Sequence, residues 1–179
     1  MIILGVDPGT ILTGFGIIRQ DGSQFLLIKN GLIKLSSKNS LPEKLAVIYD
    51  ELVDLIKLYK PDEFALETAF YGKNVQSAMK IGYARGAAIL AAAHSKIPMS
   101  EYSPREIKKS VVGKGAASKE QVSFMIKTIL SVKETKMKFD ESDAIAVALC
   151  HAFRMGNNKS RSKSWKSFVE QFPERVISQ

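Results

Sequence analysis

Residues 2–9 have the sequence IILGVDPG, a continuous apolar run that ends at Asp7 and is followed by a Pro-Gly pair. Such a run is typical of a buried β-strand. A carboxylate that interrupts or ends the run is costly to bury unless a cation or a hydrogen-bond donor compensates its charge. The stretch therefore predicts a buried strand whose terminal acid has a specific partner.

Three further carboxylates occur in comparable surroundings. Glu67 ends the apolar run at 64–66, while Asp140 and Asp143 open an Ala-rich helix. Taken singly, Asp7 could belong to a turn, Glu67 could mark a strand end, and either helix acid could be an N-cap. Together the four acids favour a metal site, because two divalent ions about 4 Å apart would neutralise them and support phosphoryl displacement. Ligation by oxygen alone favours Mg²⁺ or Mn²⁺.

The first half of the chain predicts an antiparallel meander followed by a crossover. The strands are expected at 2–6, 14–19, 25–35 and 62–67, with a hairpin turn at 21–22. A capping box at 40–43 begins an amphipathic helix over 41–59, which links the third strand to the fourth. This crossover would return the fourth strand parallel to the first, so that Asp7 and Glu67 lie near the same sheet edge.

The second half is expected to be mainly helical. A long helix over 74–95 has a small-sided middle, which indicates close packing on its own sheet or against a second subunit; the small residues are Gly82, Ala84, Gly86, Ala87 and Ala88. A short strand at 99–102 precedes two helices that begin with capping boxes at Ser103 and Ser118. A last helix over about 140–155 would carry Asp140 and Asp143 on one face of its first turn.

Length and composition favour one domain, large enough to bury a core, with a tail. The chain has 179 residues, is 45% hydrophobic and carries a formal charge of +8, which indicates a polyanionic partner. We expect a domain over 1–156 and a basic, flexible tail over 157–179. One cysteine and two histidines exclude a cysteine zinc cluster. The absence of a long apolar run or a signal-peptide pattern favours a soluble, cytoplasmic protein.

Basic and aromatic residues form the candidate DNA-binding set. The basic residues occupy a helix, a glycine loop and the start of the next helix, where they could hold phosphates or form an ordinary solvated face; they are Arg105, Lys108, Lys109, Lys114 and Lys119. Phe70 and Tyr71 directly follow Glu67, where an aromatic ring could stack on an unpaired base or anchor the loop.

In this order, several of these motifs resemble the RuvC family of bacterial Holliday junction resolvases, in the ribonuclease H-like superfamily. The similarity covers residues 1 to about 155 and rests on residues 3–9, 13–16, 66–70, 84–86, 111–113 and the Asp-x-x-Asp-Ala motif at 140–144. The resemblance implies an α/β, ribonuclease H-like fold with a five-stranded mixed sheet in the order 3-2-1-4-5, flanked by helices.

The resemblance also implies an activity and a site. RuvC proteins are homodimers that nick two opposing strands of a four-way DNA junction, and they act with the RuvA and RuvB branch-migration proteins. By position, the Mg²⁺ or Mn²⁺ ligands would be Asp7, Glu67, Asp140 and Asp143. Related members carry a histidine at the position of Asp140. Phe70 matches an aromatic residue that stacks at the junction, and Lys108 and Lys119 match residues that contact the DNA backbone.

Two alternatives from other classes remain open at this point. An actin-like or sugar-kinase-like ATPase also has an apolar strand followed by Asp, Gly and Thr, but such folds need a second, related domain. A non-catalytic structural DNA-binding protein could keep the same scaffold. The cost of clustering four acids without cations argues against the second alternative.

Overall fold

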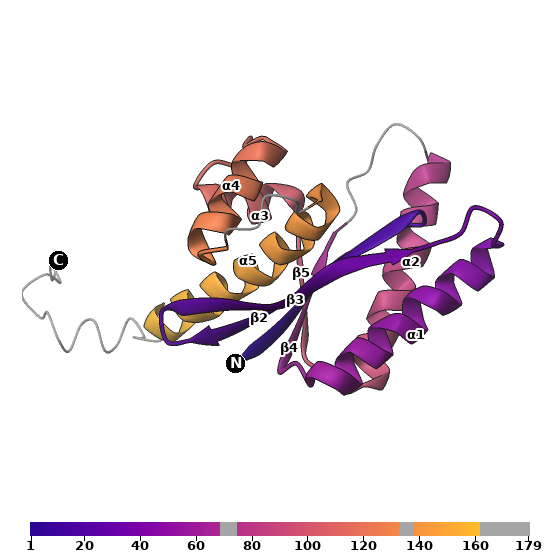
Figure 1. Ribbon diagram of the computed structural model, residues 1–179, viewed down its shortest axis with the longest axis horizontal. Coiled ribbons are helices and arrows are strands. Elements are labelled where there is room, and N and C mark those ends of the chain that lie inside the picture. The colour runs from indigo at the N-terminus through magenta and orange to yellow at the C-terminus, as the bar shows by residue number, and fades with distance from the viewer. Residues whose placement is uncertain (69–74, 133–137, 162–179) are drawn as a thin grey trace, which may run out of the picture.

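The computed structural model describes residues 1–68, 75–132 and 138–161. A five-stranded mixed sheet, in the order β3-β2-β1-β4-β5, forms its centre, which confirms the predicted fold class (Figure 1). The strands are β1 (Ile2–Asp7), β2 (Leu12–Asp21), β3 (Gln24–Lys34), β4 (Glu63–Glu67) and β5 (Met99–Tyr102). The helices are α1 (Leu41–Tyr59), α2 (Val75–His94), α3 (Pro104–Val112), α4 (Lys119–Ile129) and α5 (Phe139–Arg161).

The strands pair as the crossover argument predicts. β1 and β2 are antiparallel, as are β2 and β3, and Gly22 between them has a φ of +60°, which suits a tight hairpin turn. β4 lies parallel to β1 with Val6 opposite Leu66. The residues that follow this pair, Asp7 and Glu67, therefore leave the sheet side by side at its carboxyl edge.

Local sequence signals set the starts of three helices. Capping boxes precede α1, α3 and α4, with Ser40, Ser103 and Ser118 as the N-caps. Each box satisfies backbone groups that the first helical turn leaves unpaired. α3 ends at Gly113, which has a φ of +83° and closes the helix in the left-handed conformation. The helix that carries Lys108 is thus fixed at both ends by sequence.

Helices lie on both sides of the sheet (Figure 1), and a hydrophobic cluster fills the space on each side. On one face α5 crosses the strands, and α3 and α4 pack against α5. On the other face the core side chains of α1 and α2 meet Leu4, Phe64 and Leu66. The small residues Ala84, Ala87 and Ala88 of α2 belong to this second cluster, which confirms that part of the predicted small-sided face packs within the domain.

The first turns of α5 pack unusually close to β1 and β2, because the residues of these strands beneath the helix are glycines. A Cβ atom at Gly5 would overlap the carbonyl oxygen of Ala144, and one at Gly14 would overlap the carbonyl oxygen of Asp140. A Cβ at Gly16 would lie 2.9 Å from the Cα of Ile145. The helix backbone, rather than its side chains, therefore rests on the strands, and this contact sets the height of Asp140 and Asp143 above the sheet edge.

α5 also extends further than the sequence predicts. The expected end was near residue 155, but the helix continues to Arg161 because no proline interrupts residues 156–161 and Gly156 is tolerated within the helix. The predicted boundary between a domain over 1–156 and a tail over 157–179 stays a prediction, and residues 162–179 lie outside the described part. Among the described helices, none combines the length and apolar character needed to cross a membrane.

Candidate metal centre and DNA-binding surface

Two of the predicted acids meet at the ends of adjacent parallel strands. Asp7 ends β1 and Glu67 ends β4, and both residues are partly buried. The two carboxyl groups interact with each other through a side-chain hydrogen bond. The loop that follows Asp7 is held by Thr13, whose hydroxyl donates to the Gly9 carbonyl at 2.9 Å and accepts from the Gly9 amide at 3.2 Å. Asp7 therefore leaves the strand on a fixed turn.

The other two acids reach this edge from α5. One carboxylate oxygen from each of Asp7, Asp140 and Asp143 lies within 4.8 Å of the others. α5 begins at Phe139, so Asp140 lies inside the helix and is not its N-cap. Neighbouring Glu141 accepts a hydrogen bond from the Lys138 amide at 2.9 Å and so caps the helix start. The helix geometry thus gives the two adjacent acids different tasks.

The cluster raises the pKa of its buried members. Burial, followed by the charges of Asp143 and Asp140, raises the pKa of Asp7 from 3.8 to about 6. Burial and the charge of Asp7 raise the pKa of Glu67 further, from 4.5 to about 9. Both shifts express the cost of holding several carboxylates together in a poorly hydrated place. Of the two carboxyl groups, Glu67 therefore keeps a proton more readily than Asp7.

A lysine partly offsets this negative charge. The Lys119 ammonium donates to the Asp143 carboxylate at 2.8 Å, and this bond is the main cause of the raised pKa of Lys119. Lys119 comes from the first turn of α4, just after its Ser118 cap. A cavity of about 280 Å³ lies beside the pair and is lined by Asp7, Glu67, Lys108, Lys119 and Asp143. Acids and lysines therefore share one recess.

The donor set fits a hard divalent cation. All the clustered ligand atoms are carboxylate oxygens, which Mg²⁺ and Mn²⁺ prefer, and they come from two separate elements, β1 and α5. A cation would stabilise the ionised carboxylates and thereby remove the repulsion that raises the pKa values of Asp7 and Glu67. Asp7, Asp140 and Asp143 would hold it directly, with Glu67 joining once it loses its proton.

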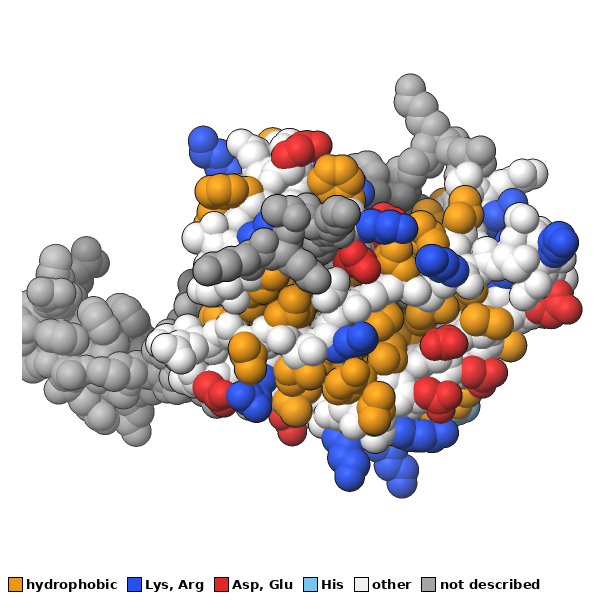
Figure 2. Space-filling model, viewed as in Figure 1, with side chains coloured by type: hydrophobic (Ala, Val, Ile, Leu, Met, Phe, Trp, Pro, Cys, Tyr) orange, Lys and Arg blue, Asp and Glu red, His pale blue; other side chains and the backbone are white. Residues whose placement is uncertain are grey.

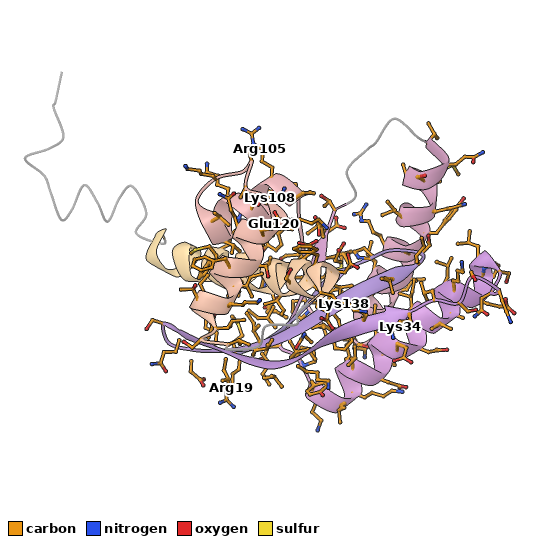
Figure 3. All side chains as sticks on the ribbon, turned by 45° about the horizontal axis from the view of Figure 1, so that its top comes forward. Arg19, Lys34, Arg105, Lys108, Glu120 and Lys138 are labelled. Atoms are coloured by element: carbon orange, nitrogen blue, oxygen red, sulfur yellow. The ribbon has the colours of Figure 1, made fainter. Side chains whose placement is uncertain are left out.

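The predicted basic residues divide into near and far members. Lys108 and Lys119 line the cavity with the acids. Arg105 and Lys114 line the next recess together with Lys108. Lys109 faces a third recess, which it shares with Arg105 and Arg154. Figure 3 shows Arg105 and Lys108 on α3, with Arg105 pointing away from the body of the molecule. A continuous basic surface thus leads from the acids over α3, although Lys109 is not part of the acid recess.

Phe70 and Tyr71 lie outside the described residues, so their predicted stacking role stays a prediction. One recess near the acids was missed at the sequence level. It is lined by loop residues 9–12, by Lys44 of α1, by Lys80 of α2 and by Asp140. No local sequence signal links these segments, because only the fold brings them together.

Comparison with known proteins adds an independent observation. The family model described as crossover junction endodeoxyribonuclease RuvC matches residues 3–151. The chain belongs to the RuvC family. The RuvC of Chloroherpeton thalassium is 44% identical over 185 residues, covering 99% of this chain and 100% of the relative.

Solved RuvC structures agree with the fold. A Thermus thermophilus RuvC structure superposes with a TM-score of 0.80 at 32% identity, covering 87% of this chain and 97% of the other. The T. thermophilus RuvC in complex with a Holliday junction substrate gives a TM-score of 0.79 at 30% identity, with the same coverage. The order of motifs that suggested the RuvC family in the sequence is therefore confirmed at the level of family and fold.

Proposed function

We propose that this protein resolves Holliday junctions by metal-dependent nicking of two opposing strands, in DNA recombination and repair. The observation that carries the proposal is the convergence of Asp7, Asp140 and Asp143 within 4.8 Å, beside Glu67 and beneath two lysines. Membership of a family of crossover junction endodeoxyribonucleases, one relative of which is described in complex with a Holliday junction, supports the choice of substrate.

The chemistry requires little more from the protein than geometry and charge. Two bound Mg²⁺ ions, replaceable by Mn²⁺, would activate a water molecule and stabilise the departing 3′ oxygen. The four acids would hold these ions, and Asp7 is the one that interacts with Glu67 as well as with both helix acids. Lys119, which donates to Asp143, would turn to a DNA phosphate, and Lys108 would contact the same strand. Phe70 would stack on an unpaired base.

A nicking assay tests the proposal. A synthetic four-way junction is incubated with Mg²⁺ and the wild-type protein, the Asp7→Asn variant, or Asp50→Asn, an exposed acid on α1 that serves as the control. We expect paired nicks from the wild type and from Asp50→Asn, and none from Asp7→Asn. Junction binding without nicking by the wild type would instead favour the non-catalytic alternative. Equal nicking by Asp7→Asn would contradict the proposed site.

Phosphate contacts give a second test. For the wild type, the logarithm of junction affinity should fall with the logarithm of salt concentration by about 0.9 per phosphate neutralised. Lys108→Ala and Lys119→Ala should each make this slope shallower by up to about that amount. An unchanged slope would show that these lysines do not contact DNA phosphates and belong to an ordinary solvated face.

Paired nicking requires a homodimer, for which α2 is the candidate interface. Its outward side carries Val75, Met79, Tyr83 and Leu90, which are 44–70% exposed. Gly82 and Gly86 lie on the same side, and a Cβ at either would meet nothing within 4 Å, so a second helix could approach closely. Met79→Glu with Tyr83→Glu should yield monomers in sedimentation, whereas Leu58→Glu on α1 should not. A dimer that survives the α2 changes would exclude this interface.

The remaining partners rest on the family resemblance. RuvA and RuvB would supply the junction by branch migration, and the protein would act in the cytoplasm, where bacterial DNA is found. The ATPase alternative has lost its support, since the RuvC family model matches residues 3–151 and a RuvC relative is covered over its full length.

A further inference from the structure

A second recess adjoins the acid cluster and shares no lining residue with the recess that contains Lys119. It measures about 760 Å³, and its walls come from the β1–β2 loop, the start of α1 and the first turns of α2. Thr10, Ile11, Leu41, Lys44, Lys80 and Asp140 are among its lining residues. None of these except Asp140 has a role in the site described above.

Asp140 joins the recess directly to the metal centre. Its carboxylate belongs to the cluster with Asp7 and Asp143, while the residue itself lines the recess. The 280 Å³ cavity that contains Lys108 and Lys119 is lined by Asp7, Glu67 and Asp143, but not by Asp140. The acids therefore separate two depressions. A DNA strand whose phosphate lies at the acids must continue in two directions, and each depression offers one of them.

The chemistry of the recess suits a nucleic-acid strand. Neither Lys44 nor Lys80 forms an ion pair with any described residue. Lys44 also lies in the first turn of α1, where the helix dipole disfavours a cation unless an anion is near. Ile11, Leu41 and Ile81 supply apolar surface between the lysines, as expected where sugars and bases pack while phosphates meet lysines.

The position of the recess also leaves room for a dimer. Ser77, Lys80 and Ile81 line the recess from the side of α2 that turns toward the domain, whereas Met79, Tyr83 and Leu90 occupy the outward side. At 3.6 residues per turn, Ser77 and Ile81 lie on the face roughly opposite these residues, while Lys80 lies at the border between the two faces. In the space-filling view, Lys and Arg side chains occur over both the α3–α4 half and the α1–α2 half of the molecule (Figure 2). Basic groups are thus available on both sides of the metal centre.

We infer that this recess holds the cleaved DNA strand on the side of the scissile phosphate opposite Lys119, with Lys44 and Lys80 on its backbone phosphates. The inference rests on the proposed junction-cleaving function. It assigns two positioning residues that the sequence did not indicate, and it gives the strand a path from α3, across the acids, to the gap between α1 and α2.

Binding measurements on junction DNA provide the first part of the test. The double variant Lys44→Ala/Lys80→Ala is compared with Lys29→Ala/Lys57→Ala, which removes the same charge from β3 and from the far end of α1. Both are made in the Asp7→Asn background, so that binding is measured without cleavage. The recess variant should bind about 10-fold or more weakly, and its salt slope should be shallower by about 0.7–0.9 for each phosphate that the protein no longer neutralises. The control pair should match the parent.

Uncharged analogues of single DNA phosphates show which phosphates the two lysines contact. Methylphosphonate groups replace single phosphates on either side of the cleaved bond, and affinities are combined as a double-mutant cycle. On one side of the bond the substitution should weaken the parent protein but leave the recess variant unaffected, while on the other side it should weaken both. Additive losses at every position, or a recess variant that behaves like its control, would overturn the inference. Nicking by the wild type is scored separately, so failure of the junction-cleaving function itself is distinguishable.

Discussion

The two faces of the sheet are packed in different ways. On the α1–α2 face, large side chains such as Leu52 fill the space between helix and strands. On the α5 face, Gly5, Gly14 and Gly16 allow the helix backbone itself to rest on β1 and β2. Side-chain packing can relax around a change of volume, but a backbone contact leaves little room for adjustment. The α5 face therefore fixes positions, whereas the α1–α2 face mainly supplies stability.

This difference explains where the acids are placed. The carbonyl of Asp140 sits against Gly14, and Gly14 is paired with Asp7 across the β1–β2 ladder. The helix acids and the strand acid are thus held by one local backbone contact. A change that lifts α5 from the strands should disturb the metal site before it unfolds the protein.

Gly14→Ala should have the largest effect on activity. The added methyl group would overlap the Asp140 carbonyl and displace the first turn of α5. Because a misplacement of about 1 Å can cost a factor of roughly 100, junction nicking should slow by about 100-fold or more while circular dichroism still reports a folded protein. The control is Gly156→Ala, which makes the same change of glycine to alanine but lies within α5 itself, where the added methyl group meets open space. Normal nicking by Gly14→Ala would refute the positional role of this contact.

Leu52→Ala should show the opposite behaviour. Leu52 is fully buried between α1 and the sheet, so its truncation should lower the free energy of unfolding by about 2–5 kcal/mol. Nicking per folded molecule, measured well below the melting temperature, should stay close to that of the wild type. A loss of activity as large as that of Gly14→Ala would remove the distinction between the two faces.

The stabilisation of the protein by Mg²⁺ should depend on pH, and this effect should be smaller than those of the two substitutions above. The folded-state pKa values of Asp7 and Glu67 are raised, so their contribution to stability is present below about pH 4 and is lost as the pH rises through about 6 and 9. Mg²⁺ binds the ionised acids and should restore that loss. In thermal melts, the stabilisation by Mg²⁺ should be larger at pH 8 than at pH 6. An equal gain at both values, or the same gain in Asp7→Asn, would contradict the metal site.

Glu141→Gln should have the smallest effect. Glu141 caps the start of α5 through the Lys138 amide, and losing this charged acceptor should cost about 0.5–1 kcal/mol of stability. Metal binding should persist, because the neighbouring Asp140 supplies the ligand. Calorimetric titration with Mn²⁺ can compare Glu141→Gln with Asp140→Asn. A larger loss of Mn²⁺ affinity in Glu141→Gln than in Asp140→Asn would show that Glu141, and not Asp140, is the metal ligand.

The sequence predicts most of the fold because its signals are local. The apolar strands, the capping boxes and the hairpin at Gly22 each act within a few residues, and the crossover then leaves little choice of strand order. The position of Asp7 and Glu67 at one edge follows from that order, whereas the approach of Asp140 and Asp143 depends on how α5 packs on the strands. The role of the four acids as ligands stays a prediction, as do the contacts of the basic residues with DNA.

Other features required the three-dimensional structure. The division of tasks between Asp140 and Glu141 depends on where α5 begins, and sequence boundaries are uncertain by a turn. The recess with Lys44 and Lys80 joins segments that are far apart in the chain, and no periodic pattern marks it. The close seat of α5 on Gly14 is visible in the sequence only as a glycine within a strand.

The position of bound metal tests the central claim most directly. Crystals grown with Mn²⁺ would reveal each ion by its anomalous scattering. We predict two Mn²⁺ ions about 4 Å apart, with Asp7 between them and with Glu67, Asp140 and Asp143 completing the protein ligands. Mn²⁺ bound elsewhere, with the four carboxylates left without a cation, would contradict the account.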